Sequence, residues 1–330
     1  MMVLFIILLT LTLASPAFAQ EDDSYLYFDQ PLTFILEDII VSARKRNETL
    51  HDVPISIEVI SGQEIIKKSI GNLEELSSFV PNVHVGQAGL GEQLFIRGIG
   101  SGVNTGFEQT VGTFVDGIYY GRGQLARSPL FDIERVEVLK GPQSLYFGKN
   151  TIAGAFSIST INPTDDYRSS ISSLYEPNHK EKKLEGFISG SITSSTSARL
   201  SFRAYEIEGW LENGHSGAND EPFQEDRAIR LGLSYSGFDN LFLVGKLTQT
   251  EFNTVGRNKQ TYICSDALKL AESINGLIDD CSKDNTTWDG GSFVPASNSA
   301  NSGTGIDYGK QKSDTDTTNF SLNASFTAGE

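Results

Sequence analysis

Basic residues are scarce in this chain. The 330 residues include 26 lysines and arginines against 42 aspartates and glutamates, which gives a formal net charge of −16. Nucleic-acid binding depends largely on basic side chains that neutralise phosphates, so this balance argues against a nucleic-acid partner. Methionine and tryptophan are also rare, at two each, whereas 32 glycines, 20 phenylalanines and 11 tyrosines are typical of a turn-rich β protein.

Long apolar runs are absent except at the N-terminus. Residues 1–19 resemble a secretory signal peptide, because the run Val3–Ala14 is too short to span a bilayer and an A-x-A site at Ala17 and Ala19 follows it. No basic residue precedes the run, and a buried strand or helix is the alternative interpretation. Beyond residue 19 no stretch is apolar enough for a transmembrane helix. An exported chain of this kind is expected to be either soluble or a β-barrel.

Cysteine is equally scarce. Cys264 and Cys281 stand 17 positions apart in a polar stretch, and in an exported chain a disulfide is the favoured interpretation. A metal pair is less favoured, because two thiolates do not complete a zinc site and no histidine lies near them. We therefore expect no metal site and no cofactor.

Catalytic motifs are missing as well. The sequence contains no HExxH, GxSxG or P-loop pattern, and Gly98–Gly102 resembles a dinucleotide loop only superficially because no helix follows it. The chain is therefore predicted not to be an enzyme. A secreted hydrolase would need a catalytic group that the sequence does not display.

Residues 47–165 are predicted to form a small α+β domain. Val53–Ile60 reads as a strand, and two helices are expected to follow it because two polar residues have the spacing of N-terminal caps. These caps are Ser61 with Glu64, before a helix to about Ser69, and Asn72 with Glu75, before a helix that ends ahead of Pro81.

Short apolar runs separated by turn residues fill residues 93–161. The runs are LFI, TVGTFV, IYY, RVEVL, SLYF and AFSIS, and all are read as strands. Asp116-Gly117 lies between two of them and predicts a type I′ hairpin, which needs positive φ at both positions. Glu137 and Lys140 are interpreted as a solvated strand face.

After Pro163 apolar and polar residues alternate and helix signals disappear. In 198–205, Leu200 faces one way while Arg199 and Arg203 face the other. A polar inward set that includes arginine suits a barrel with an apolar exterior. Short links alternate with long ones, which would place 207–226 and 253–314 outside the cell. Six strands are predicted, near 168–175, 183–193, 198–206, 227–236, 240–252 and 315–327.

Four motifs in the first domain carry a resemblance. IRG at 96–98, FVDG at 114–117, IERVEVLKGP at 133–142 and LYFGKNTIAGA at 145–155 are similar to the plug domain of TonB-dependent outer-membrane receptors. The resemblance implies an α+β plug followed by antiparallel strands of a transmembrane β-barrel. Six strands cannot close such a barrel, which begins at about 8 strands. The chain is therefore expected to be the N-terminal fragment of a larger receptor in a Gram-negative outer membrane.

The resemblance also gives a use to the segment 20–46. Asp38, Ile39, Ile40, Val41, Ser42 and Ala43 are similar to a TonB box. Such a box would add as a strand to the periplasmic TonB C-terminal domain, with main-chain hydrogen bonds providing affinity. The alternative is a first strand of the plug sheet. The predicted order is thus signal peptide 1–19, box segment 20–46, plug 47–165 and barrel strands 166–330.

The resemblance implies two further sets of residues. Arg97 and Arg135 match plug arginines that pair with barrel-wall carboxylates and lock the plug. Ligand contacts are expected on three loops that point outward, Gly86–Glu92, Gly100–Glu108 and Tyr119–Arg127. The candidates are Gln87, Asn104, Tyr119, Tyr120 and Arg122, although both tyrosines could instead pack inside the plug.

The leading functional hypothesis is energised uptake of a scarce nutrient, most often a ferric siderophore in this family. The alternative is a secreted or surface β-rich binding module, such as an adhesin or carbohydrate-binding protein, without transport. The four plug motifs favour the first hypothesis.

Overall fold

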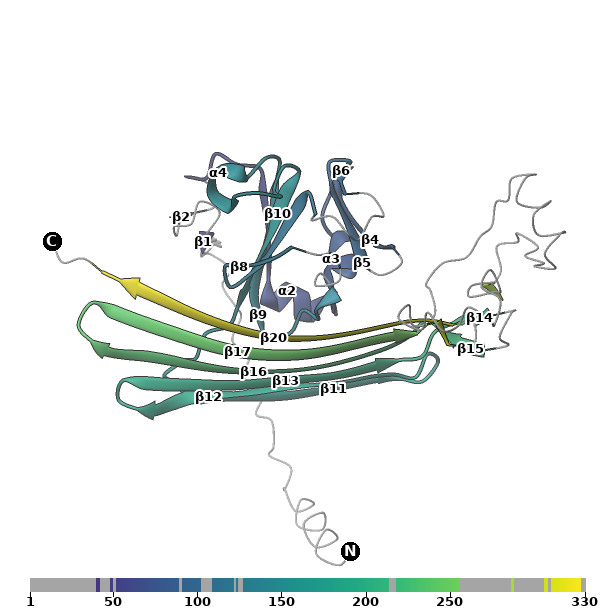
Figure 1. Ribbon diagram of the computed structural model, residues 1–330. Coiled ribbons are helices and arrows are strands. Elements are labelled where there is room, and N and C mark those ends of the chain that lie inside the picture. The colour runs from purple at the N-terminus through teal and green to yellow at the C-terminus, as the bar shows by residue number, and fades with distance from the viewer. Residues whose placement is uncertain are drawn as a thin grey trace, which may run out of the picture. The chain divides into compact units, whose positions relative to one another are not determined.

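The computed structural model describes residues 40–41, 48–49, 52–88, 91–101, 109–121, 123, 127–213, 218–255, 286–287, 306–307 and 310–327. The described residues belong to one compact unit within 39–330 and are mainly strands (Figure 1). Among them, no helix is both long and apolar enough to cross a membrane. The predicted signal peptide, 1–19, lies outside the described residues.

Residues 52–161 contain a mixed domain of two sheets and short helices. The larger sheet has the strand order β3-β9-β10-β7-β8, in which β10 and β7 are parallel and the other neighbours antiparallel. The smaller sheet has the order β4-β5-β6. The elements are β3 (Ile57–Ser61), α2 (Gly62–Lys67), α3 (Leu73–Ser77), β4 (Val83–Ala88), β5 (Gly91–Ile96), β6 (Ile99–Gly100), β7 (Val111–Val115), β8 (Ile118–Tyr120), β9 (Ile133–Lys140), α4 (Ser144–Phe147) and β10 (Gly154–Thr160).

Both predicted helix starts are confirmed. The Ser61 side chain accepts a hydrogen bond from the Glu64 N–H, and the Glu64 carboxylate accepts one from the Ser61 N–H, which completes the capping box of α2. The Asn72 side chain accepts a hydrogen bond from the Glu75 N–H at 2.9 Å and caps α3.

The predicted hairpin is also confirmed. Asp116 and Gly117 join β7 to β8 with φ values of 48° and 83°. Positive φ at both central positions defines the type I′ turn that the sequence predicted.

The mixed domain has its own apolar core. Leu76, Leu94, Ile96, Val136 and Phe156 are fully buried within one cluster that joins α3 to both sheets. Leu94 and Ile96 are alternate residues of β5, so they lie on the same face of that strand, and β9 and β10 supply Val136 and Phe156.

The second half of the chain forms a long sheet of antiparallel strands. Its order is β11-β12-β13-β16-β17-β20-β19, and Figure 1 shows the long strands as one curved layer. All six predicted strands are present. They are β11 (Arg168–Glu176), β12 (Glu181–Thr193), β13 (Thr196–Ile207), β16 (Phe223–Phe238), β17 (Leu241–Val255) and β20 (Lys310–Phe326), with β19 (Ile306–Asp307) beside β20.

The two faces of the long sheet have opposite chemistry. On β16, Arg230 and Ser234 are 6% and 5% exposed, whereas Leu231 and Leu233 are 43% and 47% exposed. The polar face is therefore the covered one, as the alternation predicted.

Short strands lie outside these sheets. β1 (Ile40–Val41) pairs with β2 (Glu48–Thr49). β14 (Leu211–Asn213) pairs with β15 (Ala218–Glu221) and with β18 (Thr286–Thr287). The last three fall within the two segments predicted to lie outside the cell.

Three local predictions are wrong. SLYF forms the helix α4, since four apolar residues between turn residues carry no period that separates a strand from a helical turn. Residues 53–56 are not in β3, and Pro54 lacks the N–H that a strand would need. Glu137 is not solvated: its side chain is 0% exposed and pairs with Arg135.

Candidate functional site: the seam between the mixed domain and the long sheet

Asp132 connects the mixed domain to strand β13. It directly precedes β9 and has a φ of 54°, in the left-handed region. Its carboxylate accepts hydrogen bonds from Arg199, whose Nε lies 3.1 Å from Oδ1 and 3.0 Å from Oδ2 and whose Nη2 also donates to Oδ1. The two side chains are 6% and 4% exposed. Because both charges have lost their water, removal of one would leave the other uncompensated.

Arg230 on β16 approaches the same turn. Its Nη1 lies 3.9 Å from Asp132 Oδ2 and donates to the carbonyl oxygens of Phe131 and Asp132 at 3.1 and 3.3 Å. Its Nε donates to Thr248 Oγ1 at 2.9 Å. The guanidinium also stacks over the Phe131 ring, 4.3 Å from its centre. Arg230 therefore contacts both the backbone of the turn at Phe131 and Asp132 and the carboxylate of Asp132.

A second carboxylate, Asp116, occupies the tip of the β7–β8 hairpin. It accepts hydrogen bonds from the Thr160 N–H at 2.9 Å and the Thr160 hydroxyl at 2.6 Å. Lys246 on β17 lies 3.5 Å from Asp116 Oδ1 and donates to the hydroxyl and carbonyl of Thr160 at 2.7 and 3.0 Å. Lys246 is 4% exposed, so this contact is buried.

The register of the long sheet places its cations in order. Arg199 pairs with Gly232, and Gly232 pairs with Lys246, so the three lie in one cross-strand row. Gly232 leaves room for Pro163, since a Cβ at Gly232 would stand 3.3 Å from Pro163 Cγ. Pro163, where the chain leaves the mixed domain, therefore packs over Gly232, which carries no side chain and lies between Arg199 and Lys246. We refer to Asp116, Asp132 and Thr160 with Arg199, Arg230 and Lys246 as the seam.

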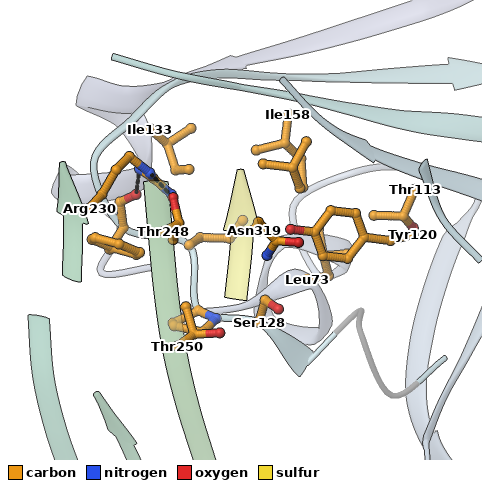
Figure 2. A pocket seen from close by; sticks show the side chains of 14 residues that line it. Leu73, Thr113, Tyr120, Ser128, Ile133, Ile158, Arg230, Thr248, Thr250 and Asn319 are labelled. Atoms are coloured by element: carbon orange, nitrogen blue, oxygen red, sulfur yellow. Dashed lines mark hydrogen bonds between the residues drawn. The ribbon is translucent and has the colours of Figure 1, made fainter. Parts of the chain in front are cut away.

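A small cavity lies between the plug residues and the sheet residues of this contact. Figure 2 shows Arg230 and Thr248 on one side of it and Tyr120 beside Asn319 on the other. Its volume is about 30 Å³, which is enough for one water molecule and too small for a nutrient. Burial raises the pKa of the Tyr120 phenol, which hydrogen bonds to Asn319 of β20. The phenol therefore stays neutral at ordinary pH.

A larger polar cleft of about 380 Å³ lies beside Asp116 and Lys246. Glu134, Arg135 and Asn323 also line it. The β7–β8 hairpin thus lies along β17. Asp116 at its tip is beside Lys246, and Tyr120 at its other end is beside Thr250. The loop after Tyr120 consequently points away from the turn that joins β16 to β17.

This arrangement is a small domain fixed by buried charges to the polar face of an antiparallel sheet. A family model described as the TonB-dependent Receptor Plug Domain matches residues 49–155. The chain contains a TonB-dependent receptor plug domain. From here on the mixed domain is called the plug.

Curated relatives extend beyond the plug. The chain is 27% identical over 198 residues to the vitamin B12 transporter BtuB of Vibrio vulnificus, covering 58% of this chain and 31% of BtuB. It is 30% identical over 178 residues to the ferric enterobactin receptor PirA of Pseudomonas aeruginosa, covering 45% of this chain and 22% of PirA. The chain spans about a third of the length of the curated relatives BtuB and the iron-regulated outer membrane virulence protein of Vibrio cholerae.

Solved structures share the fold. The similarity to the ferric-catecholate import receptor Fiu of E. coli K12 covers 84% of this chain and 36% of Fiu, with a TM-score of 0.57 and 18% identity. The similarity to the ferric yersiniabactin uptake receptor FyuA of Yersinia pestis covers 60% of this chain and 32% of FyuA, with a TM-score of 0.55 and 20% identity. Coverage of 84% includes the long sheet as well as the plug. The predicted fold class, a plug followed by antiparallel strands of a barrel, is therefore confirmed; within this chain the barrel is not closed.

The two predicted lock arginines contact plug residues. Arg97 lies in the two-residue turn between β5 and β6 and donates to Ser56 Oγ at 2.9 Å. Arg135 donates to Glu134 and Glu137, each at 2.8 Å. Their pairing with carboxylates of a barrel wall stays a prediction. Among the described residues, the ion pairs that join the plug to the long sheet have the opposite polarity, with carboxylates on the plug and cations on the sheet.

The ligand candidates are only partly described. Asn104 and Arg122 lie outside the described residues, and Gln87 is placed only as a backbone position near the end of β4. The Tyr119 hydroxyl accepts a hydrogen bond from Asn150 Nδ2 at 2.9 Å, and its ring packs against Phe114. Tyr120 is 7% exposed within the contact. Both tyrosines thus contribute to packing, and their role toward a ligand stays a prediction.

The predicted TonB box is described at Ile40 and Val41, which form β1. β1 pairs with β2, and the Val41 side chain is fully buried against Phe114 and Leu139. The pairing is outside the five-stranded sheet. The other box positions, Asp38, Ile39, Ser42 and Ala43, lie outside the described residues, as do Cys264 and Cys281.

Sequence reasoning missed the seam carboxylates. Asp116 was interpreted only as a turn residue, and Asp132 was not singled out. One signal was available, because Arg199 and Arg230 occupy inward positions of predicted strands and buried arginines require acceptors. The sequence did not show which carboxylates would meet them.

Proposed function

We propose that this chain is the plug and first barrel wall of an energised outer-membrane receptor that takes up a ferric siderophore. The observation that carries the proposal is the burial pattern of the long sheet. Its polar face, with Arg199, Arg230 and Lys246, is buried under the plug, and its apolar face is exposed. An exposed apolar band of this kind suits lipid, and a covered polar face suits a plugged lumen.

Closure by the plug argues for active transport. The space between Arg230 and Tyr120 holds about one water molecule, so a solute would pass this part of the contact only after the plug moves. Such a movement must break buried ion pairs, which requires work from outside the plug. A pull by TonB on the segment at Asp38–Ala43 would supply that work.

The state of β1 is consistent with a regulated pull. Strand addition to TonB needs a free strand edge and free side chains. In this structure Ile40–Val41 is paired with β2 and Val41 is buried. Under the proposal, occupancy of the outward loops shifts β1 toward release, which is a coupling between two separate sites.

The ligand class follows from the named relatives. PirA is a ferric enterobactin receptor, and FyuA takes up ferric yersiniabactin. BtuB transports vitamin B12, so cyanocobalamin is the second ligand to test. BtuB is named as a transporter, and PirA, FyuA and Fiu are named as receptors; none of these four is an adhesin or a secreted binding module.

The test is uptake of radiolabelled iron from ferric enterobactin by cells that produce the whole protein. Deletion of residues 38–43 should reduce uptake to background while leaving surface binding of the chelate intact. Deletion of 22–27, also ahead of the plug, is the control and should leave uptake unchanged. Undiminished uptake after deletion of 38–43 would contradict energised transport through this segment.

A further inference from the structure

A second buried charge pair lies in the plug, away from the seam. Glu92 is the second residue of β5, the strand that returns from loop 86–92, and Arg127 is the last residue of loop 119–127. Arg127 Nε lies 2.8 Å from Glu92 Oε1, with the two side chains 4% and 6% exposed. The pair therefore joins the first and third of the loops predicted to point outward.

Gln109, the residue that follows the second loop, lies at the same place. Gln109 is 6% exposed, and its backbone N–H donates to the carbonyl of Gly121 at 3.4 Å. A Cβ at Gly123 would stand 3.0 Å from Gln109 Nε2 and 2.4 Å from the Glu92 carbonyl oxygen. Gly123 thus permits a backbone contact that another residue would force apart. We refer to Glu92, Gln109, Gly123 and Arg127 as the clasp.

The clasp is fixed to the core of the plug. Glu92, Leu94 and Ile96 lie on one face of β5 because side chains alternate along a strand. Leu94 and Ile96 are fully buried in the main apolar cluster. A displacement of Glu92 would therefore be transmitted along β5 into the core.

Stability alone does not account for charges at this position. A buried ion pair is often no more stabilising than an apolar pair of the same volume, whereas it defines one relative position of its partners. Three chain segments far apart in sequence depend on that position. The terminal oxygen of Gln109 is also buried without a hydrogen-bond partner among the described residues, so the clasp holds polar atoms that an apolar cluster would avoid.

We propose that Glu92 and Arg127 are positioning residues, which hold the three loops as one recognition surface without touching the ligand. This inference rests on the proposed function, in which the loops bind a ferric chelate. It predicts that loosening the pair weakens binding through all three loops together.

The experiment compares two glutamate-to-glutamine variants of the whole protein in detergent. Glu92→Gln weakens the clasp with almost no change of shape. Glu137→Gln is the matched control, because Glu137 is also buried, at 0% exposed, and accepts from Arg135 Nε at the same 2.8 Å, on β9 away from the loops. Gly123→Ala is a second clasp variant that keeps every charge.

The readouts are amide hydrogen exchange at 86–88, 91–92, 109–110, 119–121 and 127–128, and affinity for ferric enterobactin. Glu92→Gln and Gly123→Ala should each raise exchange at all of these positions by about tenfold or more and weaken binding by a similar factor. Glu137→Gln should leave both unchanged at the loops.

Each outcome has a distinct meaning. Equal loop exchange in Glu92→Gln and Glu137→Gln, or a change confined to one loop, would overturn the proposal. Wild-type protein that binds neither ferric enterobactin nor cyanocobalamin would count against the proposed function, and the exchange comparison would still decide the clasp.

Discussion

In the plug, the side chains removed from water are mostly apolar, and Leu76, Leu94 and Phe156 are fully buried among others of their kind. On the long sheet, the side chains removed from water are mostly polar or charged, and leucines such as Leu231 remain 43% exposed. Both regions use the same two-residue alternation of a strand. The difference teaches that alternation defines two faces, and the surroundings decide which face is buried.

The two regions meet at the seam, where the alternation along a strand does not by itself decide which side chains pair. The plug contributes two carboxylates there, at Asp116 and Asp132, each held at positive φ by a turn. The long sheet contributes Arg199, Arg230 and Lys246 from three adjacent strands. Geometry at the turn and register in the sheet must both be correct for these charges to pair. The seam therefore specifies how the plug lies on this wall.

The largest effect is expected from Asp132→Ala. It leaves Arg199 buried without its carboxylate and should lower the free energy of plug unfolding by about 3–5 kcal/mol. Urea titration of the whole protein, followed by exchange of the Ile133–Lys140 amides, measures the change. Asp166→Ala removes an exposed carboxylate near the seam and should change the same quantity by less than about 0.5 kcal/mol. Equal losses of unfolding free energy in the two variants would contradict a special role for the buried carboxylate of Asp132.

A paired truncation tests the two environments of leucine. Leu94→Ala creates a cavity in the plug core and should cost about 3 kcal/mol of unfolding free energy. Leu231→Ala, on the exposed face of the long sheet, should cost less than about 0.5 kcal/mol. The same urea titration reports both. A large loss from Leu231→Ala alone would show that Leu231 is packed against other parts of the protein and that this face of the sheet is not its exposed one.

Asp116→Asn should have a smaller effect than Asp132→Ala. Asparagine can keep one of the two hydrogen bonds that Asp116 accepts from Thr160, but it loses the other and the charge that attracts Lys246, so we expect a loss of about 1–2 kcal/mol. Thr160→Val removes the hydroxyl that bonds both Asp116 and Lys246, and should cost about as much. A larger loss from Asp116→Asn than from Asp132→Ala would reverse the order of the two contacts.

The smallest effect concerns pH. Burial raises the pKa of Tyr120 in the folded protein, so the unfolded chain loses the phenolic proton first. Stability is then unaffected below pH about 10 and falls as the pH rises from there toward the folded pKa. Tyr120→Phe should remove this part of the alkaline loss. Ultraviolet titration of tyrosinate in both proteins tests it, and a Tyr120 that ionises with the exposed tyrosines would contradict it.

Local chemistry explains which parts of the fold could be predicted. The caps at Ser61 and Asn72, the turn at Asp116-Gly117 and the strands of the long sheet depend on neighbours within a few residues. The four motifs located the plug through their resemblance to a known family, which local chemistry alone would not have supplied. α4 was missed because SLYF is too short to carry a period.

Contacts between distant residues could not be predicted in the same way. Arg199 was assigned to the inward face, but its partner lies 67 positions earlier in the chain, in a turn whose orientation depends on the whole plug. Glu92 and Arg127 are a similar case. A charge at the inward position before Leu94 and Ile96 does indicate a buried partner, yet several arginines could have supplied it.

A double-mutant cycle between Asp132→Asn and Arg199→Gln tests the central claim, that the plug is held to the long sheet by plug carboxylates and sheet cations. The free energy of plug unfolding would be measured for the whole wild-type protein, both single variants and the double variant. The account predicts a coupling energy of about 1.5 kcal/mol or more between the two residues. Effects that add to within about 0.5 kcal/mol would contradict it.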